Sequence, residues 1–390
     1  MNRTRIALVT SRFWPISGIS QIVSGELAVG LAHQGCEVEI ITSRWEHNWS
    51  KLFNYRGVTV NRLPISSSGP WGNFRTQRAL TRQLNRNWDA AVICGVDDHF
   101  EPSVRVLAKT DTRIVLRLDD SVAPMELWAQ KVNRKMIAAL ESVDNIVCTN
   151  SNLRDRLLAI GVDRNKIHII ADGVPSNDHE GKIGREKSPF RVALSDAHPV
   201  LAIEPDEPLV VTGIPLNGDA GIHDLIQGWK LVARRHPRSR LWVIGDGSQG
   251  RAIWEQITES NLVYSIIMPG FFDCVDDLFM AADVYVNPAR DVTGHACLTR
   301  AMACGVCPIS TDNIDGLIEN DVNGVLVARQ DSAQFSNAIL SLMEDRDRLE
   351  RLSQAARDTV SRELPFQNTI TQYQKLVHPI SDKSSCESTS

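Results

Sequence analysis

The sequence predicts an α/β protein built from two doubly wound domains. Short apolar segments alternate with longer amphipathic segments along most of the 390 residues, which is typical of parallel sheets covered by helices. The alternation stops in a polar stretch containing proline and serine at residues 176–208 and then resumes. Because single cores stop growing at about 250–300 residues, we interpret the two blocks as two Rossmann-like domains.

The predicted strands are short, β-branched and apolar on both faces, as the strands of a buried parallel sheet are. In the first block they cover residues 6–9, 37–41, 90–94, 114–118, 145–148 and 167–170. In the second block they cover residues 209–212, 240–244, 263–268, 284–286 and 306–310.

Helices are predicted between these strands. Residues 20–34 place apolar side chains on one stripe, and Gly35 follows where a C-terminal glycine would stand. The remaining predicted helices cover residues 152–160, 222–235, 250–260, 276–282 and 298–304, and a final group runs from residue 332 to about 376.

These patterns divide the chain into a first domain, a linker, a second domain and a C-terminal helix that packs back on the first domain. The predicted boundaries are 1–180, 181–207, 208–364 and 365–380, followed by a disordered, serine-rich tail at 381–390. Ligands of open α/β sheets bind outside the carboxyl ends of the strands. We therefore expect the functional site in the cleft between the two domains.

Composition narrows the class of protein. The net charge of −5 gives no basic field for nucleic acid, and no apolar stretch reaches the roughly 20 residues that span a bilayer. The apolar run at residues 6–9 is too short for the core of a signal peptide. We expect a cytoplasmic protein whose eight cysteines are buried thiols.

Two motifs offer other functions. The segment CGVC at residues 304–307 has redox spacing, but it follows a predicted helix and precedes a strand, whereas a redox motif opens a helix. The segment GDGSQG at residues 245–250 matches the dinucleotide fingerprint, but the next strand is not followed by the acidic residue that would bind a ribose. We favour a structural glycine turn over a nicotinamide site.

Six segments, in order, resemble motifs of glycosyltransferase family 4, whose members have the GT-B fold. They are FWPISG at 13–18, DNIVCTNS at 144–151, KIHIIADGV at 166–174, ADVYVNP at 282–288, AMACGV at 301–306 and GLIENDVNG at 316–324. The resemblance extends from about residue 6 to residue 377. It implies transfer of a sugar, with retention and without a metal or other cofactor, from a nucleoside diphosphate sugar to a hydroxyl acceptor in polysaccharide or glycoconjugate synthesis.

The chain departs from that family at the charged positions. Ile214 and Ala220 stand where the family has an arginine and a lysine that neutralise the donor diphosphate, and Arg300 stands at the second of two paired glutamates. Asp291 is our choice for the first of these acids. Arg300, Arg290 and Arg12 are candidates to replace the missing cations; the alternative for Arg300 is an exposed helix residue.

The resemblance then assigns the site. The second domain would hold the donor, with phosphate on the backbone N–H groups of the helix that starts at Gly294, and the first domain would hold a sugar, lipid-linked or small-molecule acceptor. Donor-binding candidates are Gly18, Gly213, Gly270, Phe271, Gly294, Ala296, Arg300 and Glu319, and catalytic candidates are Asp119, Asp120, Asp291 and His295.

Two further interpretations stay open. The substituted charges allow a non-catalytic, GT-B-like binding or scaffolding protein. Arg75, Arg78, Arg82 and Arg86 recur at helical spacing. They form either a solvated helix face or a basic stripe that contacts the anionic inner face of a membrane.

Overall fold

The computed structural model of the chain describes residues 3–16, 18–64, 70–119, 134–175, 187–217, 221–270, 272, 274–289, 294–311 and 314–378. Four residues singled out from the sequence, Asp120, Phe271, Arg290 and Asp291, lie outside the described residues, as does the segment 381–390.

The first domain is built on an eight-stranded sheet with the strand order β3-β4-β2-β1-β5-β6-β7-β8. Every pairing is parallel except that of β3 with β4. The strands are β1 Arg5–Val9, β2 Glu37–Arg44, β3 Leu52–Tyr55, β4 Val58–Pro64, β5 Ala90–Cys94, β6 Arg113–Leu118, β7 Asn145–Cys148 and β8 Ile167–Ile169.

The second domain is built on a six-stranded sheet, parallel throughout, with the order β11-β10-β9-β12-β13-β14. Its strands are β9 Leu209–Gly213, β10 Arg240–Ile244, β11 Ile266–Gly270, β12 Val284–Asn287, β13 Cys307–Ser310 and β14 Val325–Leu326. The prediction of two α/β domains with parallel sheets is confirmed.

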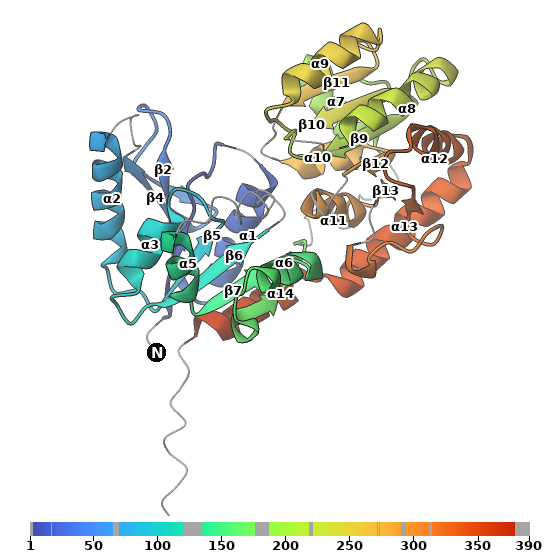
Figure 1. Cartoon of the computed structure of the whole chain (residues 1–390). Helices are drawn as coiled ribbons and strands as arrows, with labels where there is room; N and C mark the ends of the chain where they lie inside the picture. The colour runs from blue at the N-terminus through green and yellow to red at the C-terminus, as the bar shows by residue number, and fades with distance from the viewer. Residues whose placement is uncertain are drawn as a thin grey trace, which may run out of the picture.

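Helices cover both faces of each sheet (Figure 1). Those of the first domain are α1 Ile19–His33, α2 Pro70–Leu84, α3 Phe100–Leu107, α5 Arg134–Glu141 and α6 Ser151–Ala159. Those that follow are α7 Ser188–Ala197, α8 Ile222–Arg235, α9 Gly250–Glu259, α10 Val275–Ala281, α11 His295–Ala303, α12 Ser332–Glu344, α13 Arg346–Glu363 and α14 Phe366–Val377. Short 3-10 turns are η1 Arg164–Lys166, η2 Pro199–Leu201 and η3 Ile314–Gly316.

The chain crosses between the domains twice at one place. Val174, leaving the first domain, forms a parallel bridge with Pro365, where the chain returns. The last helix, α14, then packs against α1 and buries Ile370 and Tyr373 in the first core, where Figure 1 shows it in red beneath that domain. A side chain at Gly30 of α1 would lie 2.4 Å from Ile370. The expected return of the C-terminal helix is therefore confirmed.

Two differences from the sequence predictions concern the segment after β2 and the predicted linker. A β3–β4 hairpin turns at Arg56 and Gly57, both with positive φ (48° and 92°), as a two-residue hairpin turn requires. The predicted linker contains α7, and Leu194 of α7 and Leu201 of η2 are buried in the second domain's core. Most of that segment thus belongs to the second domain.

No helix in the described part of the chain combines the length and apolar character needed to cross a membrane.

Candidate functional site

A cavity of about 570 Å³ lies between the two domains. Thr149, after β7, and Ala171, after β8, line it from the first domain. From the second domain it is lined by His295 at the start of α11, by Glu319 and by residues of α13. Two of the residues predicted from the sequence, His295 and Glu319, therefore meet at the expected place, the carboxyl ends of strands facing across the domains.

The cavity has several carboxylates on the side of α13. Asp315, Glu319, Asp358 and Glu363 all line it. The main-chain N–H of Ser151 donates to Asp315 Oδ2 at 3.1 Å, a contact that joins the two domains. Arg362 of α13 also lines the cavity, so the lining of this side is mixed in charge.

Helix α11 begins without a side-chain cap. Its N-cap residue is Gly294, with φ of 89°, and it makes no side-chain capping hydrogen bond. A side chain at Gly294 would lie 2.7 Å from Ile214 and 3.0 Å from Asn287 Oδ1, so both the conformation and the space require glycine. Helix N-termini with unbonded N–H groups favour anions, and His295 and Ala296 follow directly.

Two buried polar side chains of the second sheet have no hydrogen-bond partner among the described residues, and one of them, Asn287, lies beside this helix end. Asn287, the last residue of β12, is fully buried, and among the described residues neither its Oδ1 nor its Nδ2 has a hydrogen-bond partner. Thr212 in β9 is also fully buried, and its Oγ1 has no partner in the same set. Leaving buried polar groups unbonded costs about 1–3 kcal/mol each. Sequence reasoning missed both; the available signal was a polar residue at the end of a buried strand.

Gly213 brings the end of β9 close to α11. A Cβ on Gly213 would lie 3.4 Å from Cys297 Sγ in that helix, an ordinary contact. Gly245 and Gly247 lie under the same loop, because a Cβ on either would lie 2.3 Å from a carbonyl oxygen, of Ile214 and Leu216 respectively. The GDGSQG segment therefore packs against the loop after β9, a contact that the sequence analysis did not predict.

Gly270, another donor-binding candidate, ends β11. It has φ of 87°, and an added Cβ would meet no atom within 4 Å. Its carbonyl accepts a hydrogen bond from Gly245 N at 3.2 Å. Gly270 is thus placed at the carboxyl end of the second sheet.

On the first-domain side, Asp119 is held by Arg117. The buried Arg117 donates from Nη1 to Asp119 Oδ2 at 2.7 Å and from Nη2 to Asp172 Oδ2 at 2.6 Å. Burial disfavours its charge, but the two carboxylates outweigh burial and raise the pKa of Arg117. Asp119 therefore carries an ordered carboxylate at the end of β6. Gly18, with extended φ of 173°, is the N-cap of α1.

The expectation that Arg300 faces the donor diphosphate is wrong. Its side chain is 4% exposed and makes four hydrogen bonds of 2.8–2.9 Å, two to Glu26 of α1 and two to Asp276 of α10. Burial disfavours its charge, yet Glu26 and Asp276 raise the pKa of Arg300 well above its ordinary value. The guanidinium is fully engaged by carboxylates, so it neither binds phosphate nor lies exposed on the helix.

The other proposed cations lie elsewhere. Arg12 stacks on Trp45 of the first domain at 5.1 Å. In α2, Arg75, Arg78 and Arg82 are exposed, whereas Arg86, beyond the end of that helix, pairs with Glu39 at 2.7 Å. The basic stripe is therefore reduced to three arginines on the surface of α2 that form no ion pair with a described residue.

The seven cysteines in the described part of the chain are free thiols, and all of them are buried except Cys274, which is exposed. Burial raises the pKa of Cys304 well above its ordinary value and that of Cys307 to about 12. Neither thiol would ionise readily, which argues against redox chemistry at CGVC.

Comparisons with known proteins match both halves of the chain. Residues 17–173 match the family model described as glycosyl transferase 4-like domain, and residues 209–345 match that of glycosyl transferases group 1.

Curated relatives are matched over part of their length. Glycogen synthase of Mycobacterium tuberculosis is 28% identical over 161 residues, which are 40% of this chain and 39% of that protein. D-inositol 3-phosphate glycosyltransferase of Xylanimonas cellulosilytica is 25% identical over 236 residues, 57% of this chain and 53% of that protein. The chain thus matches about half of these relatives or less.

Solved structures match over nearly the whole chain. Sucrose-phosphate synthase from Thermosynechococcus elongatus has a TM-score of 0.72 at 18% identity and covers 96% of this chain and 98% of its own. HepE from Anabaena, solved with UDP-glucose, has a TM-score of 0.69 at 14% identity and covers 96% and 99%. With this shared fold and with family models matching both domains, the chain belongs to the GT-B glycosyltransferases of family 4.

Proposed function

We propose that the chain transfers a sugar from a nucleoside diphosphate sugar to a hydroxyl acceptor, with retention of configuration at the transferred carbon. Glycogen synthase of M. tuberculosis and the solved complex of HepE with UDP-glucose make a nucleotide sugar the donor of choice. We further propose that the reaction serves the synthesis of a polysaccharide or glycoconjugate in the cytoplasm.

The start of α11 carries this proposal. Gly294 lacks a capping side chain, and His295, the next residue, lines the interdomain cavity. The dipole of the helix and its first N–H groups favour a diphosphate at that point. The unbonded amide of Asn287, beside Gly294, offers one further donor and one acceptor.

In this mechanism the positive potential for the leaving diphosphate comes from the helix end and not from a metal ion. The backbone at Gly294 and Ala296 receives the phosphates, and His295 supplies a proton or hydrogen bond as charge develops on the leaving group. Gly213 and Gly270 let the main chain approach the nucleotide. Glu319 faces the cavity and accepts hydrogen bonds from sugar hydroxyls.

The first domain binds the acceptor in this proposal. Asp119, held by Arg117 at 2.7 Å, presents an ordered carboxylate to an acceptor hydroxyl, and Gly18 lets the loop before α1 approach it. Asp120 and Asp291 complete the proposed catalytic set. Closure of the two domains over both substrates excludes water and thereby suppresses hydrolysis of the donor.

Isothermal titration with UDP-glucose, ADP-glucose and GDP-mannose, together with release of nucleoside diphosphate on turnover, tests the proposal. Gly294→Ala should weaken the donor that binds, because left-handed strain of about 1–2 kcal/mol adds to its clash with Ile214 and Asn287. Gly35→Ala is the matched control. Gly35 has φ of 90° but no atom within 4 Å of an added Cβ, so this variant carries the same strain far from the site.

The second candidate is a non-catalytic GT-B binding protein. The observation in its favour is that Arg300 is engaged by Glu26 and Asp276, while Ile214 stands at a position where the family has an arginine. Absence of heat with every donor tested, together with absence of turnover, would select this candidate.

A further inference from the structure

The second domain has another groove at the opposite edge of its sheet. It has a volume of about 710 Å³ and lies between α7 and α13. Among its lining residues, Asp283 directly precedes β12 and Glu207 lies just before β9. The groove is thus at the amino ends of the strands, whereas the candidate donor site is at their carboxyl ends.

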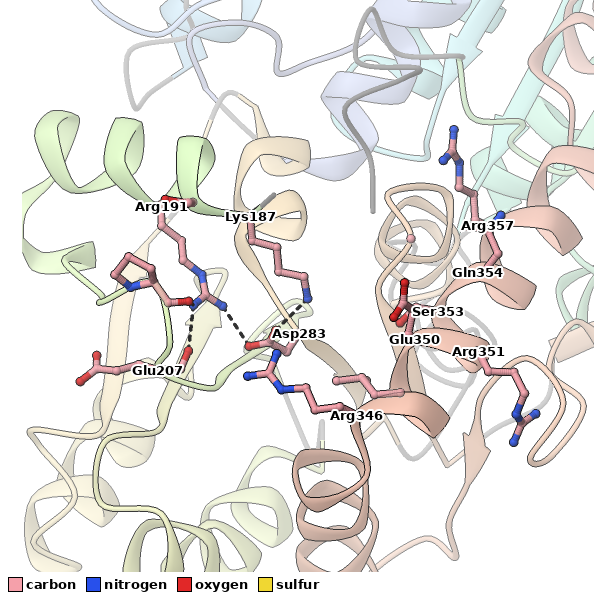
Figure 2. A pocket seen from close by; sticks show the side chains of 14 residues that line it. Lys187, Arg191, Glu207, Asp283, Arg346, Glu350, Arg351, Ser353, Gln354 and Arg357 are labelled. Carbon is pink, nitrogen blue, oxygen red and sulfur yellow. Dashed lines mark hydrogen bonds and ion pairs between the residues drawn. The ribbon is translucent and has the colours of Figure 1, made fainter. Parts of the chain in front are cut away.

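The floor of this groove is a fixed ionic network. Asp283 Oδ1 accepts from Lys187 Nζ at 2.8 Å, and its Oδ2 accepts from Arg191 Nη2 at 2.9 Å and from Leu209 N at 2.7 Å. Figure 2 shows Lys187 and Arg191 meeting at this carboxylate. Although burial opposes its charge, the two cations lower the pKa of Asp283. The carboxylate is fully engaged and offers no charge to a ligand.

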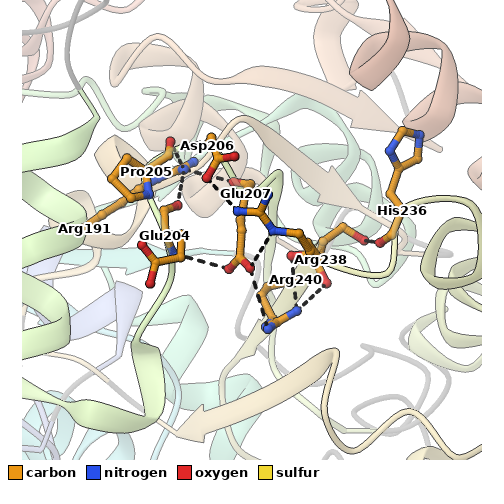
Figure 3. Close-up of polar contacts among 9 residues, drawn as sticks. Arg191, Glu204, Pro205, Asp206, Glu207, His236, Arg238 and Arg240 are labelled. Carbon is orange, nitrogen blue, oxygen red and sulfur yellow. Dashed lines mark hydrogen bonds and ion pairs between the residues drawn. The ribbon is translucent and has the colours of Figure 1, made fainter.

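Glu207 is neutralised in a similar way. Its Oε1 lies 3.4 Å from Arg238 Nε and 4.0 Å from Arg240 Nη2. Arg191 Nη1 also donates to the carbonyls of Glu204, Pro205 and Glu207 at 2.8–3.2 Å, and so ties this loop to the groove floor (Figure 3). Two of the three carboxylates that line the groove, those of Asp283 and Glu207, are therefore paired with cations.

Two of the arginines by which α13 lines the groove have no partner among the described residues. Arg346 and Arg357 make no ion pair or hydrogen bond with any of the described residues. Figure 2 shows Arg346 extending towards Asp283 and Arg357 at the other end of the wall. Glu350, between them, is the remaining carboxylate without a partner in the described part of the chain. The groove thus carries a surplus of positive charge in a chain whose net charge is −5.

The spacing of the two arginines selects a long ligand. Arg346 and Arg357 are eleven positions apart in α13, so their Cα atoms lie about 16 Å apart along the helix axis. One phosphate group would not reach both guanidinium groups. A chain with negative groups at intervals would.

The other residues that line the groove indicate the chemical class of the ligand. Among the described residues that line the groove, none is aromatic and could stack a base, and the only apolar side chains are those of Pro205 and Leu349, too few for a lipid or an apolar peptide. Ser188, Ser353 and Gln354 present the hydroxyl and amide groups that bind sugar hydroxyls. We propose that this groove binds an anionic oligosaccharide, with its acidic groups on Arg346 and Arg357.

The test is titration of the intact protein with trigalacturonate, with maltotriose as a neutral sugar and with tripolyphosphate as an anion without sugar. Trigalacturonate should bind, and Arg346→Ala and Arg357→Ala should each weaken it about tenfold. Arg348→Ala is the matched control, because Arg348 is on the same helix but does not line the groove and donates to Asp321 Oδ1 at 2.8 Å. Its effect should stay within about twofold, and maltotriose should not bind.

The proposal is overturned if trigalacturonate does not bind, or if it binds equally well to the Arg346 and Arg357 variants. Equal binding of tripolyphosphate, with the same losses in these variants, would reduce the groove to a general anion patch and overturn the assignment to carbohydrate. Titration with UDP-glucose separates this proposal from the proposed reaction, because neither variant should change donor binding at the far edge of the sheet. Failure of all donors to bind would leave the trigalacturonate result valid.

Discussion

Arg300 in α11 donates to both carboxylate oxygens of Glu26 in α1, from Nη1 at 2.8 Å and from Nη2 at 2.9 Å. The same guanidinium holds Asp276, so one cation serves two carboxylates at the contact between the domains. Burying such charges costs several kcal/mol per ion, and an apolar contact would stabilise as well. We infer that the triad serves to define one arrangement of the two domains, including the position of α11 relative to α1.

Replacement of Glu26 tests this inference. Glu26→Ala removes the half of the triad that crosses between the domains and leaves the Arg300–Asp276 pair intact within the second domain. We expect a loss of about 1–3 kcal/mol, because donors of a buried guanidinium lose their acceptor. The domains should also separate, which an increase in the radius of gyration by small-angle X-ray scattering would detect.

Ser151→Ala is the control for that experiment. It removes an exposed contact between the domains, since Ser151 Oγ and Asp315 Oδ1 are hydrogen-bonded at the rim of the cleft. We expect little change in domain separation. A compact Glu26→Ala protein, with the radius of gyration of the parent chain, would contradict a role of the triad in setting the arrangement.

The triad should also make stability depend on pH. Burial raises the pKa of Glu26 above its ordinary value of 4.5; the Arg300 charge counters this, and the Asp276 charge adds to it. The folded state therefore binds this proton more tightly than the unfolded state. The resulting stabilisation is present below pH 4.5 and is lost as the pH rises through the raised pKa.

Glu26→Gln keeps a hydrogen-bonding side chain but does not titrate. The free energy of unfolding of the parent chain, minus that of Glu26→Gln, should fall as the pH rises above 4.5. Urea unfolding across a pH series measures the difference, in which the titration of groups that do not interact with Glu26 cancels. A difference that rises with pH would mean that the Arg300 charge, and not burial, dominates the titration of Glu26.

The sequence predicts the architecture well because strand and helix periodicity are local. Most of the central strands fall within a residue or two of their predicted bounds, because they are buried on both faces and mostly apolar, with polar residues such as Thr212 and Asn287 near their ends. The β3 strand was missed because half-exposed and exposed residues alternate along it, and α7 was missed because its few buried side chains lie in a polar segment.

The candidate site was predictable only in part. Gly294, at the start of α11, was identified from the sequence. The structure shows why this position requires glycine: its φ is positive, and a side chain would clash with Ile214. The pairing of Arg300 was not visible, because Glu26 is 274 positions away in the chain and is chosen by the way the domains meet. The unbonded state of Asn287 likewise depends on surroundings that only the folded structure supplies.

Asn287→Leu should weaken donor binding without lowering the stability of the protein. Asn287 is buried and has no partner among the described residues. An apolar side chain of similar size should therefore leave the stability unchanged or raise it by up to about 1–3 kcal/mol. Donor binding should weaken, because the amide lies beside Gly294, where the proposed phosphate site begins. Thermal unfolding with and without UDP-glucose measures both effects.

Asn323→Leu is the contrast for that variant. Asn323 accepts from Glu319 N at 2.7 Å and donates to the carbonyl of Leu317 at 3.0 Å, so its replacement should destabilise the protein by about 1–3 kcal/mol. Equal destabilisation by Asn287→Leu would indicate that Asn287 has structural partners and no ligand role.

The surface of α2 gives a prediction about membranes. Arg75, Arg78 and Arg82 are exposed, and each cation near an anionic lipid surface contributes about 1 kcal/mol. If the peripheral contact that we propose exists, the protein should co-sediment with phosphatidylserine vesicles at low salt and release at high salt. Arg86 is left unchanged because its reversal would place a carboxylate against Glu39, its partner at 2.7 Å.

Reversal of Arg75, Arg78 and Arg82 to glutamate should abolish vesicle binding. The matched control reverses three exposed basic residues on other elements, Arg164, Arg234 and Lys375, none of which forms an ion pair with a described residue, and changes the net charge equally. If both triple variants lose binding to the same degree, the attraction follows net charge, and α2 is a solvated helix face. Loss confined to the α2 variant would mean that this helix orients the first domain, and with it the proposed acceptor site, towards the lipid surface.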